Sequence, residues 1–435
     1  MKTILHFLLA CTPLFAVGQG YTSYFTGNSS DLITIPNGGI CLMGGASEDD
    51  NAMKWFLEKA NGGDVLVLRA SGSDGYNDYL YSDLGITVNS VETIVCNNAT
   101  ASDNPYVLQK IEQAEAIWFA GGDQWDYISY WRNTPVDSAV NAAISERNIV
   151  IGGTSAGMAI QGKFYFSAQI GTVSSATALS NPYNSFVTVD STSFIKNDLL
   201  GDVITDTHFD SPDRKGRLVT FLARIYTDYG IFGKAIACDE YTAVCIETDG
   251  TAKVFGDHPS SDDNAYFIQS NCELTNQAPE NCSQSNPLTW NLNEEALKVY
   301  QIKGNSTGSN SFNLNTWQSG SGGTWNDWSV LNGVLTEQSG APINCSVSVE
   351  ESSSIDNVQL VPNPVEDYFT LTVSEELASD YEITIINQLG QSIQVEMLFK
   401  KSSITFSCDH LPAGIYTLLL KNSDGTSTAK RIIKK

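Results

Sequence analysis

The sequence contains little positive charge. Lys and Arg account for 24 of its 435 residues, against 49 Asp and Glu, so the formal net charge is −25. Nucleic acids and anionic membranes are bound through patches of Lys and Arg, so neither partner is expected, and most of the acidic charge is expected to favour solubility. Beyond the first residues no apolar run reaches the roughly 20 residues that a transmembrane helix needs, so no transmembrane segment is predicted.

Histidine is equally scarce. The chain has four, at positions 6, 208, 258 and 410. Because His is the side chain that most often acts as a general base, any chemistry that needs an imidazole has few candidates. The acidic loop Ser47–Asp50 is the strongest candidate for a metal site, but four adjacent polar residues are usually solvated. We therefore predict no metal and no cofactor.

Residues 1–18 are typical of an export signal. Lys2 gives a positive start, the stretch from Ile4 to Val17 is largely apolar, and small residues follow in the cleavage region. Leu8-Leu9-Ala10-Cys11 is an alternative, because it resembles a lipoprotein processing site. We expect export in either case.

Eight cysteines remain once the signal is removed. An even number of cysteines in an oxidising compartment favours disulfides. Cys272 and Cys282 flank a polar loop, so we expect a local disulfide between them. Cys41, Cys238 and Cys245 lie within apolar runs, where buried thiols are expected.

Between Gly38 and Val254, short apolar runs alternate with amphipathic stretches. Predicted strands cover Gly39–Met43, Asp64–Leu68, Val91–Val95, Ala116–Ala120 and Ile149–Ile151, and predicted helices cover Asn51–Ala60, Pro105–Ala114 and Pro135–Arg147. Strands that alternate with helices indicate an α/β fold, with a parallel central sheet flanked by helices. Sites in such sheets lie at the carboxyl ends of the strands, where Gly44-Gly45, Gly121-Gly122 and a serine turn are found.

The rest of the chain differs in composition. Residues 255–345 are predicted to be a loop-rich β extension of the main domain, which would span residues 19–345. Its tryptophans either line a binding face for sugars or peptides or cover a sheet edge; they are Trp290, Trp317, Trp325 and Trp328. Residues 346–356 read as a polar linker, and residues 357–435 as a small all-β sandwich domain.

The serine turn is Gly153-Thr154-Ser155-Ala156-Gly157. A serine hydroxyl becomes a nucleophile when a neighbouring base removes its proton. A hydrophobic strand precedes the turn, and its glycines permit a sharp reversal into a helix, the arrangement of a nucleophile elbow. Ser155 is therefore the predicted nucleophile.

The base for this serine has two candidates. His6 lies in the signal and His410 in the C-terminal domain, which leaves His208 and His258. His208 follows the apolar run Val203–Asp206 and is expected at the end of a strand. His258 lies in a segment with the composition of a turn, so we favour His208.

Asp239 and Glu240 are candidates for the carboxylate that orients the imidazole. They follow one apolar run, Ala235–Cys238, and precede another, Ala243–Ile246. One of the two can face the site while the other points away. The order serine, histidine, acid differs from the order in α/β-hydrolases.

Two backbone N–H groups are candidates for an oxyanion hole. One belongs to Ala156, directly after the serine. The other belongs to Gly122, in the turn after the strand Ala116–Ala120. Glycine suits this role because the backbone must approach the substrate closely.

Four segments in this order resemble the cyanophycinase family of serine peptidases. They are Phe119-Ala120-Gly121-Gly122-Asp123-Gln124, Gly153-Thr154-Ser155-Ala156-Gly157, Asp206-Thr207-His208-Phe209 and Asp239-Glu240-Tyr241-Thr242-Ala243. The resemblance covers roughly residues 38–254. It implies an α/β fold similar to that of class I glutamine amidotransferases, and it makes a homodimer a candidate assembly.

The resemblance also implies roles for single residues. Ser155 matches the family's nucleophile, His208 its base and Glu240 its acid, which favours Glu240 over Asp239. Residues that match substrate-binding positions are Gln124, Asp206, Arg214 and Arg217.

Two positions depart from the family pattern. Family members resemble Asp-Gln-His-Phe followed by three spaced arginines, whereas Thr207 replaces the glutamine and Pro212 stands in place of the first arginine. Losing a planar, charged donor changes the recognition of carboxylates. Family members cleave peptides after a β-linked aspartyl residue, so the resemblance implies an aspartyl-peptide peptidase of altered specificity.

The C-terminal domain resembles the sorting domain of the Bacteroidetes type IX secretion system. The matching segments are Val361-Pro362-Asn363-Pro364, Leu389-Gly390-Gln391, Leu411-Pro412-Ala413-Gly414-Ile415-Tyr416 and the basic end Lys430–Lys435. The resemblance implies that the secretion machinery is a partner, and that the protein is secreted or held at the outer-membrane surface.

Together these patterns predict an exported serine-type exopeptidase. Its substrate would be an aspartyl-linked peptide, cleaved through an acyl-enzyme by Ser155, His208 and Glu240. The alternative is an extracellular binding protein for peptides or glycans, built on the same scaffold with its catalysis lost.

Overall fold

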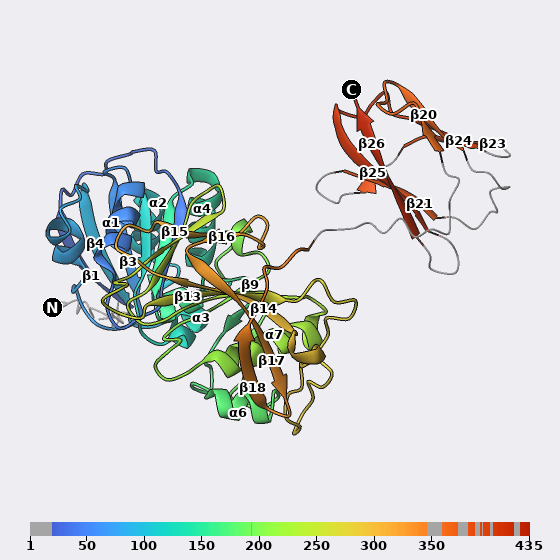
Figure 1. The fold of residues 1–435 in the computed structure, drawn as a ribbon. Helices are drawn as coiled ribbons and strands as arrows, with labels where there is room; N and C mark the ends of the chain where they lie inside the picture. The colour runs from blue at the N-terminus through green and yellow to red at the C-terminus, as the bar shows by residue number, and fades with distance from the viewer. Residues whose placement is uncertain are drawn as a thin grey trace, which may run out of the picture. The chain divides into compact units, whose positions relative to one another are not determined.

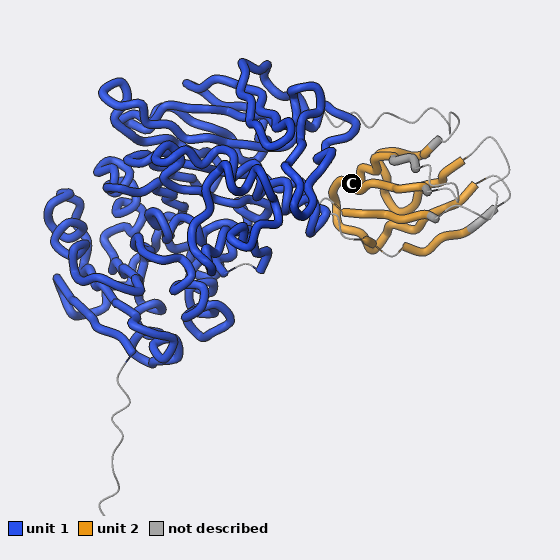
Figure 2. The backbone as a smooth tube through the Cα atoms, turned by 90° about the horizontal axis from the view of Figure 1, so that it is seen from below, with its two compact units in different colours: residues 1–345 blue, residues 346–435 orange. Residues whose placement is uncertain are grey.

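The computed structural model describes residues 20–192, 194–345, 359–372, 382–387, 392–393, 395–400, 403–421 and 427–435. The chain divides into two compact units, Met1–Cys345 and Ser346–Lys435, drawn in blue and orange in Figure 2. The predicted signal peptide at residues 1–18 and the predicted linker at residues 346–356 lie outside the described residues.

A ten-stranded sheet runs through the larger unit (Figure 1). Its strands lie in the order β1 (Tyr21–Gly27), β4 (Ser90–Cys96), β3 (Asp64–Arg69), β5 (Ala116–Phe119), β6 (Val150–Thr154), β2 (Gly39–Met43), β11 (Ala243–Ile246), β12 (Thr251–Phe255), β15 (Asn310–Asn313) and β16 (Gly320–Ser321). The pairings from β4 to β2 are parallel, and the outer pairings are antiparallel. The predicted α/β class with a parallel central sheet is therefore confirmed.

Helices bury both faces of the parallel strands. The helices are α1 (Asp50–Lys59), α2 (Pro105–Gln113), α3 (Gln124–Trp131), α4 (Pro135–Arg147), α5 (Ala156–Ala159), α6 (Ser175–Ser180) and α7 (Lys215–Tyr229), with short turns η1 (Tyr79–Asp83), η2 (Ala99–Ala101), η3 (Asp198–Leu200) and η4 (Leu292–Glu294). In β5, Trp118 packs into the same apolar cluster as α1, whereas Phe119 packs into the cluster of α2, α3 and α4. Burial on both faces explains why these strands read as unbroken apolar runs.

Two of the predicted helices begin at capping side chains, but α4 is predicted without such a cap and α3 is missed although Asp123 caps it. Asp49 accepts a hydrogen bond from the N–H of Ala52 at the start of α1, and Asn104 caps α2 in front of Pro105. The sequence patterns predict neither α3 nor α7. The residue before α7, Arg214, makes no capping hydrogen bond, and a basic start opposes the helix dipole. Among the described residues, no helix has the length and apolar character needed to cross a membrane.

A second sheet completes the larger unit. Its strands lie in the order β18 (Val334–Ser339), β17 (Gly323–Leu331), β14 (Leu297–Lys303), β13 (Asn264–Ser270), β10 (Lys234–Cys238) and β9 (Val203–Asp206). A two-stranded sheet pairs β7 (Tyr165–Phe166) with β8 (Val189–Asp190). Residues 255–345 contribute strands to both large sheets. In Figure 1 the green α6 and α7 lie beside the orange β17 and β18, and Lys215 of α7 pairs with Glu337 of β18.

The tryptophans of this segment are core residues. Trp290, Trp317 and Trp328 are each at most 2% exposed, and Trp325 is partly buried. Trp317 packs on the ring of Phe267, for example, rather than facing solvent. Burial excludes the first alternative, a binding face lined by these rings, for the three buried tryptophans.

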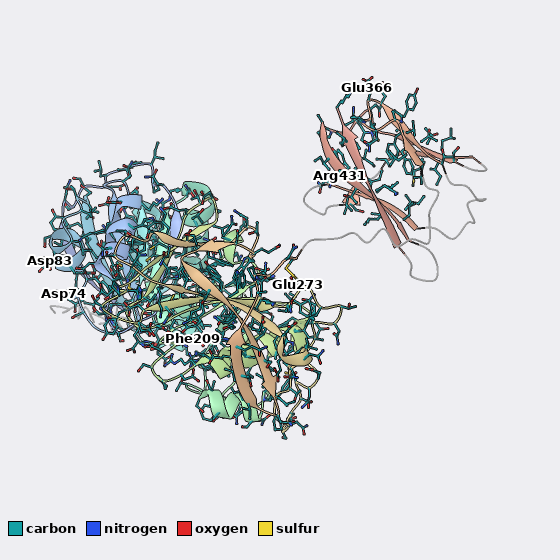
Figure 3. All side chains as sticks on the ribbon, in the orientation of Figure 1. Asp74, Asp83, Phe209, Glu273, Glu366 and Arg431 are labelled. Atoms are coloured by element: carbon teal, nitrogen blue, oxygen red, sulfur yellow. A yellow bond between two sulfur atoms is a disulfide. The ribbon has the colours of Figure 1, made fainter. Side chains whose placement is uncertain are left out.

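One disulfide joins Cys272 to Cys345, beside Glu273 in Figure 3. The predicted bond between Cys272 and Cys282 is wrong, because Cys282 is a free, half-buried thiol. Cys345 ends the larger unit, and the fold returns it to the loop after β13. The prediction paired Cys272 with Cys282 because the two are close in the sequence, whereas the disulfide joins residues 73 positions apart. Cys41, Cys238 and Cys245 are buried thiols, as predicted.

The smaller unit is all-β, as predicted. One sheet has the order β19 (Gln359–Val361), β20 (Tyr368–Thr372), β24 (Ser403–Ser407) and β23 (Met397–Lys400), and the other has the order β22 (Ser392–Ile393), β21 (Glu382–Ile386), β25 (Gly414–Lys421) and β26 (Ser427–Lys434). Side chains from both sheets share one apolar cluster, which includes Phe369, Phe406 and Leu418. The predicted turn at Leu389–Gln391 lies outside the described residues.

We predict that the disulfide stabilises the larger unit. It closes a loop with a sequence separation of 73, and a cross-link of that span reduces the entropy of the unfolded chain. Cys272→Ser together with Cys345→Ser is expected to lower the free energy of unfolding by about 2–4 kcal/mol, measured by chemical denaturation. Cys282→Ser is the control, with an expected effect below about 1 kcal/mol. Equal stability of the double variant and the wild type would contradict the assignment.

Candidate active site

Ser155 lies in the tight turn between β6 and α5. Its backbone φ is 51° and its ψ is −114°, a left-handed conformation that is uncommon for a residue other than glycine. The turn packs directly on β5, because a Cβ placed on Gly157 would lie 2.0 Å from the carbonyl oxygen of Phe119. This strand, turn and helix have the geometry of a nucleophile elbow.

Two hydrogen bonds connect Ser155, His208 and Glu240. The serine Oγ lies 2.8 Å from His208 Nε2, and His208 Nδ1 lies 2.6 Å from Glu240 Oε1. An ionised carboxylate only accepts hydrogen bonds, so the imidazole proton is assigned to Nδ1. Nε2 is then free to accept a proton from the serine hydroxyl.

The two sheets bring these side chains together. His208 follows β9 and Glu240 follows β10, and these strands pair in parallel, so their carboxyl ends lie at the same edge. Ser155 comes from β6 of the other sheet. The residue after the histidine, Phe209, is fully buried against Tyr266 and Trp328 and anchors the segment (Figure 3).

The alternative residues lie elsewhere. His258 is exposed in a turn and does not line the cavity at Ser155. Asp239 is 2% exposed, and its Oδ2 accepts hydrogen bonds from the backbone N–H and the side-chain amide of Asn264. Its side chain makes no hydrogen bond to His208. The geometry therefore favours His208 and Glu240 over these alternatives.

A cavity of about 330 Å³ opens beside the serine. It is lined by Gly122, Asp123, Gln124, Ser155, Ala159, Phe166, Ala168, Gly171, Thr172, Thr205, Asp206, Thr207, His208, Arg214 and Arg217. The four side chains predicted to bind substrate are among them. The described residues include no group of His, Cys, Asp and Glu side chains that could hold a metal ion.

Asp206 and Arg217 form a buried ion pair in the wall of this cavity. Arg217 Nε donates to Asp206 Oδ2 at 2.9 Å, and Nη2 donates to Oδ1. Both side chains are less than 5% exposed, and Arg217 Nη1 donates to Thr172 at 3.1 Å. Because the guanidinium is held in this bidentate pair, the two charges largely cancel.

Arg214 is the one guanidinium of the cavity lining that is not held in an ion pair, and Asp123 is the unpaired carboxylate of the same lining. Its Nη1 donates to the carbonyl of Thr207 at 2.8 Å, and it forms no ion pair within the described part of the chain. Burial, and then the charge of Arg217, lower the pKa of Arg214. A guanidinium stays protonated at neutral pH despite such a shift. The Arg214 side chain therefore offers a positive charge to a ligand at this part of the wall.

Gln124, Gly122 and Ala156 also lie at this site. Gln124 begins α3, and its side-chain amide donates to the carbonyl of Phe166 at 3.3 Å, while its oxygen remains an acceptor. Gly122 lines the cavity, and Ala156 is the first residue of α5. The first N–H groups of a helix have no partner within it, so the N–H of Ala156 is available to a ligand.

The sequence analysis missed one wall of the cavity. The segment between β7 and α6 contributes Ala168, Gly171 and Thr172, and the ring of Phe166 lies 5.2 Å from the Arg217 guanidinium carbon. No motif distinguishes these residues. Their pairing with Arg217 depends on a contact that spans 45 residues of chain.

The fold and the site define a class of protein. A serine, a histidine and a carboxylate in hydrogen-bond contact, presented at the ends of strands in an α/β fold, are typical of hydrolases. Residues 55–253 match the model of peptidase family S51, and residues 359–435 match that of the secretion system C-terminal sorting domain. Over residues 55–253 the larger unit is therefore similar to peptidase family S51. The sorting domain implies interaction with a secretion machinery and export.

Curated relatives have the same kind of similarity. A cyanophycinase of Synechococcus elongatus is 25% identical over 50% of this chain and 66% of its own length, and one of Trichormus variabilis is 26% identical over 48% and 62%. The match thus spans just under two thirds of these relatives. A solved peptidase from an acI-B1 Actinobacterium has a TM-score of 0.42 and 15% identity, over 64% of this chain and 98% of that one.

We predict that Asp239, beside Glu240, makes stability depend on pH. Burial raises its pKa from 3.8 to about 7, so between these values the folded protein holds a proton that the unfolded chain has released. Stability from this group is therefore greatest below pH 4 and decreases as the pH rises to about 7, by at most about 1.4 kcal/mol per pH unit.

Asp239→Asn tests this prediction. The amide oxygen can still accept from Asn264, so the variant is expected to be more stable than the wild type at pH 8, with a flatter pH dependence between pH 4 and 7. Urea unfolding at several pH values measures both. Asp78→Asn, at an exposed position, is the control and should keep the wild-type dependence. An unchanged slope in Asp239→Asn would contradict the prediction.

Proposed function

We propose that this protein is an exported serine-type peptidase, an exopeptidase that acts on aspartyl-linked peptides. The observation that carries the proposal is the hydrogen-bond chain Ser155–His208–Glu240, with distances of 2.8 and 2.6 Å, at the wall of one cavity. Similarity to a peptidase family supports it. The glutamine-amidotransferase-like assignment of the fold is part of the same proposal.

In the proposed mechanism, His208 Nε2 removes the proton of the Ser155 hydroxyl as its Oγ attacks the scissile carbonyl carbon. The N–H groups of Ala156 and Gly122 stabilise the oxyanion, and Glu240 stabilises the imidazolium. Collapse breaks the C–N bond, and the imidazolium gives its proton to the leaving amine. Water, deprotonated by His208, then hydrolyses the acyl-enzyme and restores the serine.

The cavity supports a small acidic substrate. Its volume of about 330 Å³ is at the low end for ligand sites, which favours a terminal residue over an extended chain. Arg214 provides the charge that would bind a carboxylate, with Gln124 as a polar neighbour. The Asp206–Arg217 pair would hold this wall in place. Thr207, in the cavity wall, and Pro212, an exposed residue outside the lining, replace family residues, so we propose a specificity that differs from that of the relatives named cyanophycinase.

The binding-protein alternative has less support. Three of the tryptophans that would form its binding face are buried, and the substituted pocket is the one remaining observation in its favour. Export rests on the sorting domain. We propose that a signal peptide at residues 1–18 is removed and that the mature protein is secreted or held at the outer-membrane surface. A homodimer stays a prediction.

We predict that Ser155→Ala abolishes peptidase activity. Without the nucleophile, the rate on α- and β-aspartyl dipeptides or cyanophycin should decrease by at least about 10³-fold. His258→Ala, at an exposed position outside the cavity, should keep wild-type activity. A fluorophosphonate should label the wild type at Ser155. Equal activity of Ser155→Ala and the wild type, or no labelling together with measurable peptide binding, would favour the alternative function.

We predict that Arg214 recognises a substrate carboxylate. Arg214→Met should raise KM for aspartyl dipeptides by about 10- to 100-fold, the effect of losing a charge-assisted hydrogen bond of roughly 1.5–3 kcal/mol. Dipeptide amides, which lack the carboxylate at the tested position, are the matched control and should respond little to the variant. If Arg214→Met loses the same activity on the dipeptides and on the dipeptide amides, Arg214 does not bind the substrate carboxylate.

A further inference from the structure

The end of β2 contacts all three parts of the proposed catalytic site through its backbone. Three consecutive carbonyls each accept one N–H: Met43 from Ser155 at 3.0 Å, Gly44 from His208 at 2.9 Å, and Gly45 from Tyr241 at 3.1 Å. Tyr241 is the residue after Glu240. The N–H of Gly44 also donates to the carbonyl of Thr242 at 2.9 Å, which closes the contact on the acid's loop.

The three residues that donate these hydrogen bonds share an unusual backbone. Ser155 has a φ of 51°, His208 of 48° and Tyr241 of 61°. Residues other than glycine rarely adopt a positive φ, and they keep it only where the surrounding structure holds them. The carbonyls of β2 are positioned to hold each one. The serine, the histidine and the loop of the acid thus depend on a single segment of chain.

The absence of a side chain at Gly44 and at Gly45 is also required. A Cβ placed on Gly45 would lie 2.4 Å from both Nε2 and Cε1 of His208, and one on Gly44 would lie 2.0 Å from the carbonyl oxygen of Asp239. Real Cβ atoms do not approach other atoms so closely, so the imidazole would have to move. Gly45 is buried, with φ of +123°, and lies directly against the ring.

We propose that Met43, Gly44 and Gly45 form a positioning segment that sets Ser155, His208 and Glu240 in register, with Gly45 as the positioning residue for the imidazole. The segment suits this role because β2 pairs with β6, which leads to the serine, and with β11, which follows the acid. It therefore connects the serine of one sheet to the histidine and acid of the other. The proposal rests on the proposed function only in naming these side chains catalytic.

Gly45→Ala tests the proposal. The added methyl group should displace the imidazole from Ser155, and a displacement of about 1 Å costs roughly 10²-fold in rate. We expect kcat on an aspartyl dipeptide to decrease at least that much, with KM within about threefold, because the cavity wall at Arg214 and Gln124 is unchanged. Gly85→Ala is the matched control: Gly85 also has a positive φ, +72°, but no atom lies within 4 Å of its added Cβ. It should keep wild-type kcat.

A spectroscopic measurement separates this proposal from the peptidase assignment. The proton between His208 Nδ1 and Glu240 should give a downfield ¹H NMR resonance in the wild type and in Gly85→Ala, and His208→Gln should remove it. Gly45→Ala should shift or lose it. This readout needs no substrate. A wild type that cleaves none of the peptides would therefore overturn the proposed function, while the resonance would still test the positioning role of Gly45. Wild-type kcat or an unshifted resonance in Gly45→Ala would overturn the positioning role.

Hydrogen exchange decides the matter if Gly45→Ala does not fold. In the wild type, the amides of Ser155, His208 and Tyr241 should be protected and should exchange as one group, because one segment holds all three. Circular dichroism establishes whether the variant is folded. If any of the three amides exchanges as quickly as amides of exposed loops, the positioning segment does not hold that residue and the proposal is overturned.

Discussion

Parallel pairing of β6 between β5 and β2 is the constraint on which the larger unit depends. A buried strand needs partners for its N–H and C=O groups on both sides, and here those partners fix where the strand ends. Gly152 and Gly153 permit the pairing, since a Cβ on Gly152 would lie 2.7 Å from both Cys41 O and the Trp118 ring. The serine turn that follows β6 therefore lies at the carboxyl ends of β5 and β2.

The second sheet positions the two side chains that are linked to Ser155 by hydrogen bonds, His208 and Glu240. His208 and Glu240 follow its two parallel strands, β9 and β10, and residues 255–345 provide the other strands of this sheet. The segment that looks like a loop-rich extension is therefore part of the structural support of the site. Its tryptophans stabilise the sheets by burial.

Charge is distributed unevenly in this protein. The protein has a net charge of −25, whereas the cavity lining contains an ion pair, Asp206 and Arg217, together with the unpaired Arg214 and Asp123. A buried ion pair is a poor source of stability, but its bidentate geometry holds the wall rigid. Under the proposed function, Arg214 would act at short range and select a small anionic group over an extended polyanion.

Local patterns in the sequence determined the α/β class, most strands of the central sheet, the serine turn, and the short list of histidines and acids from which His208 and Glu240 come. These features depend on neighbouring residues: apolar runs, capping side chains and glycines. Only the tertiary structure established the His208–Glu240 hydrogen bond, the Cys272–Cys345 disulfide, the Asp206–Arg217 pair and the contacts of Gly45. Each joins segments that are distant in the sequence, and no local pattern records which distant backbone atom a strand end will meet.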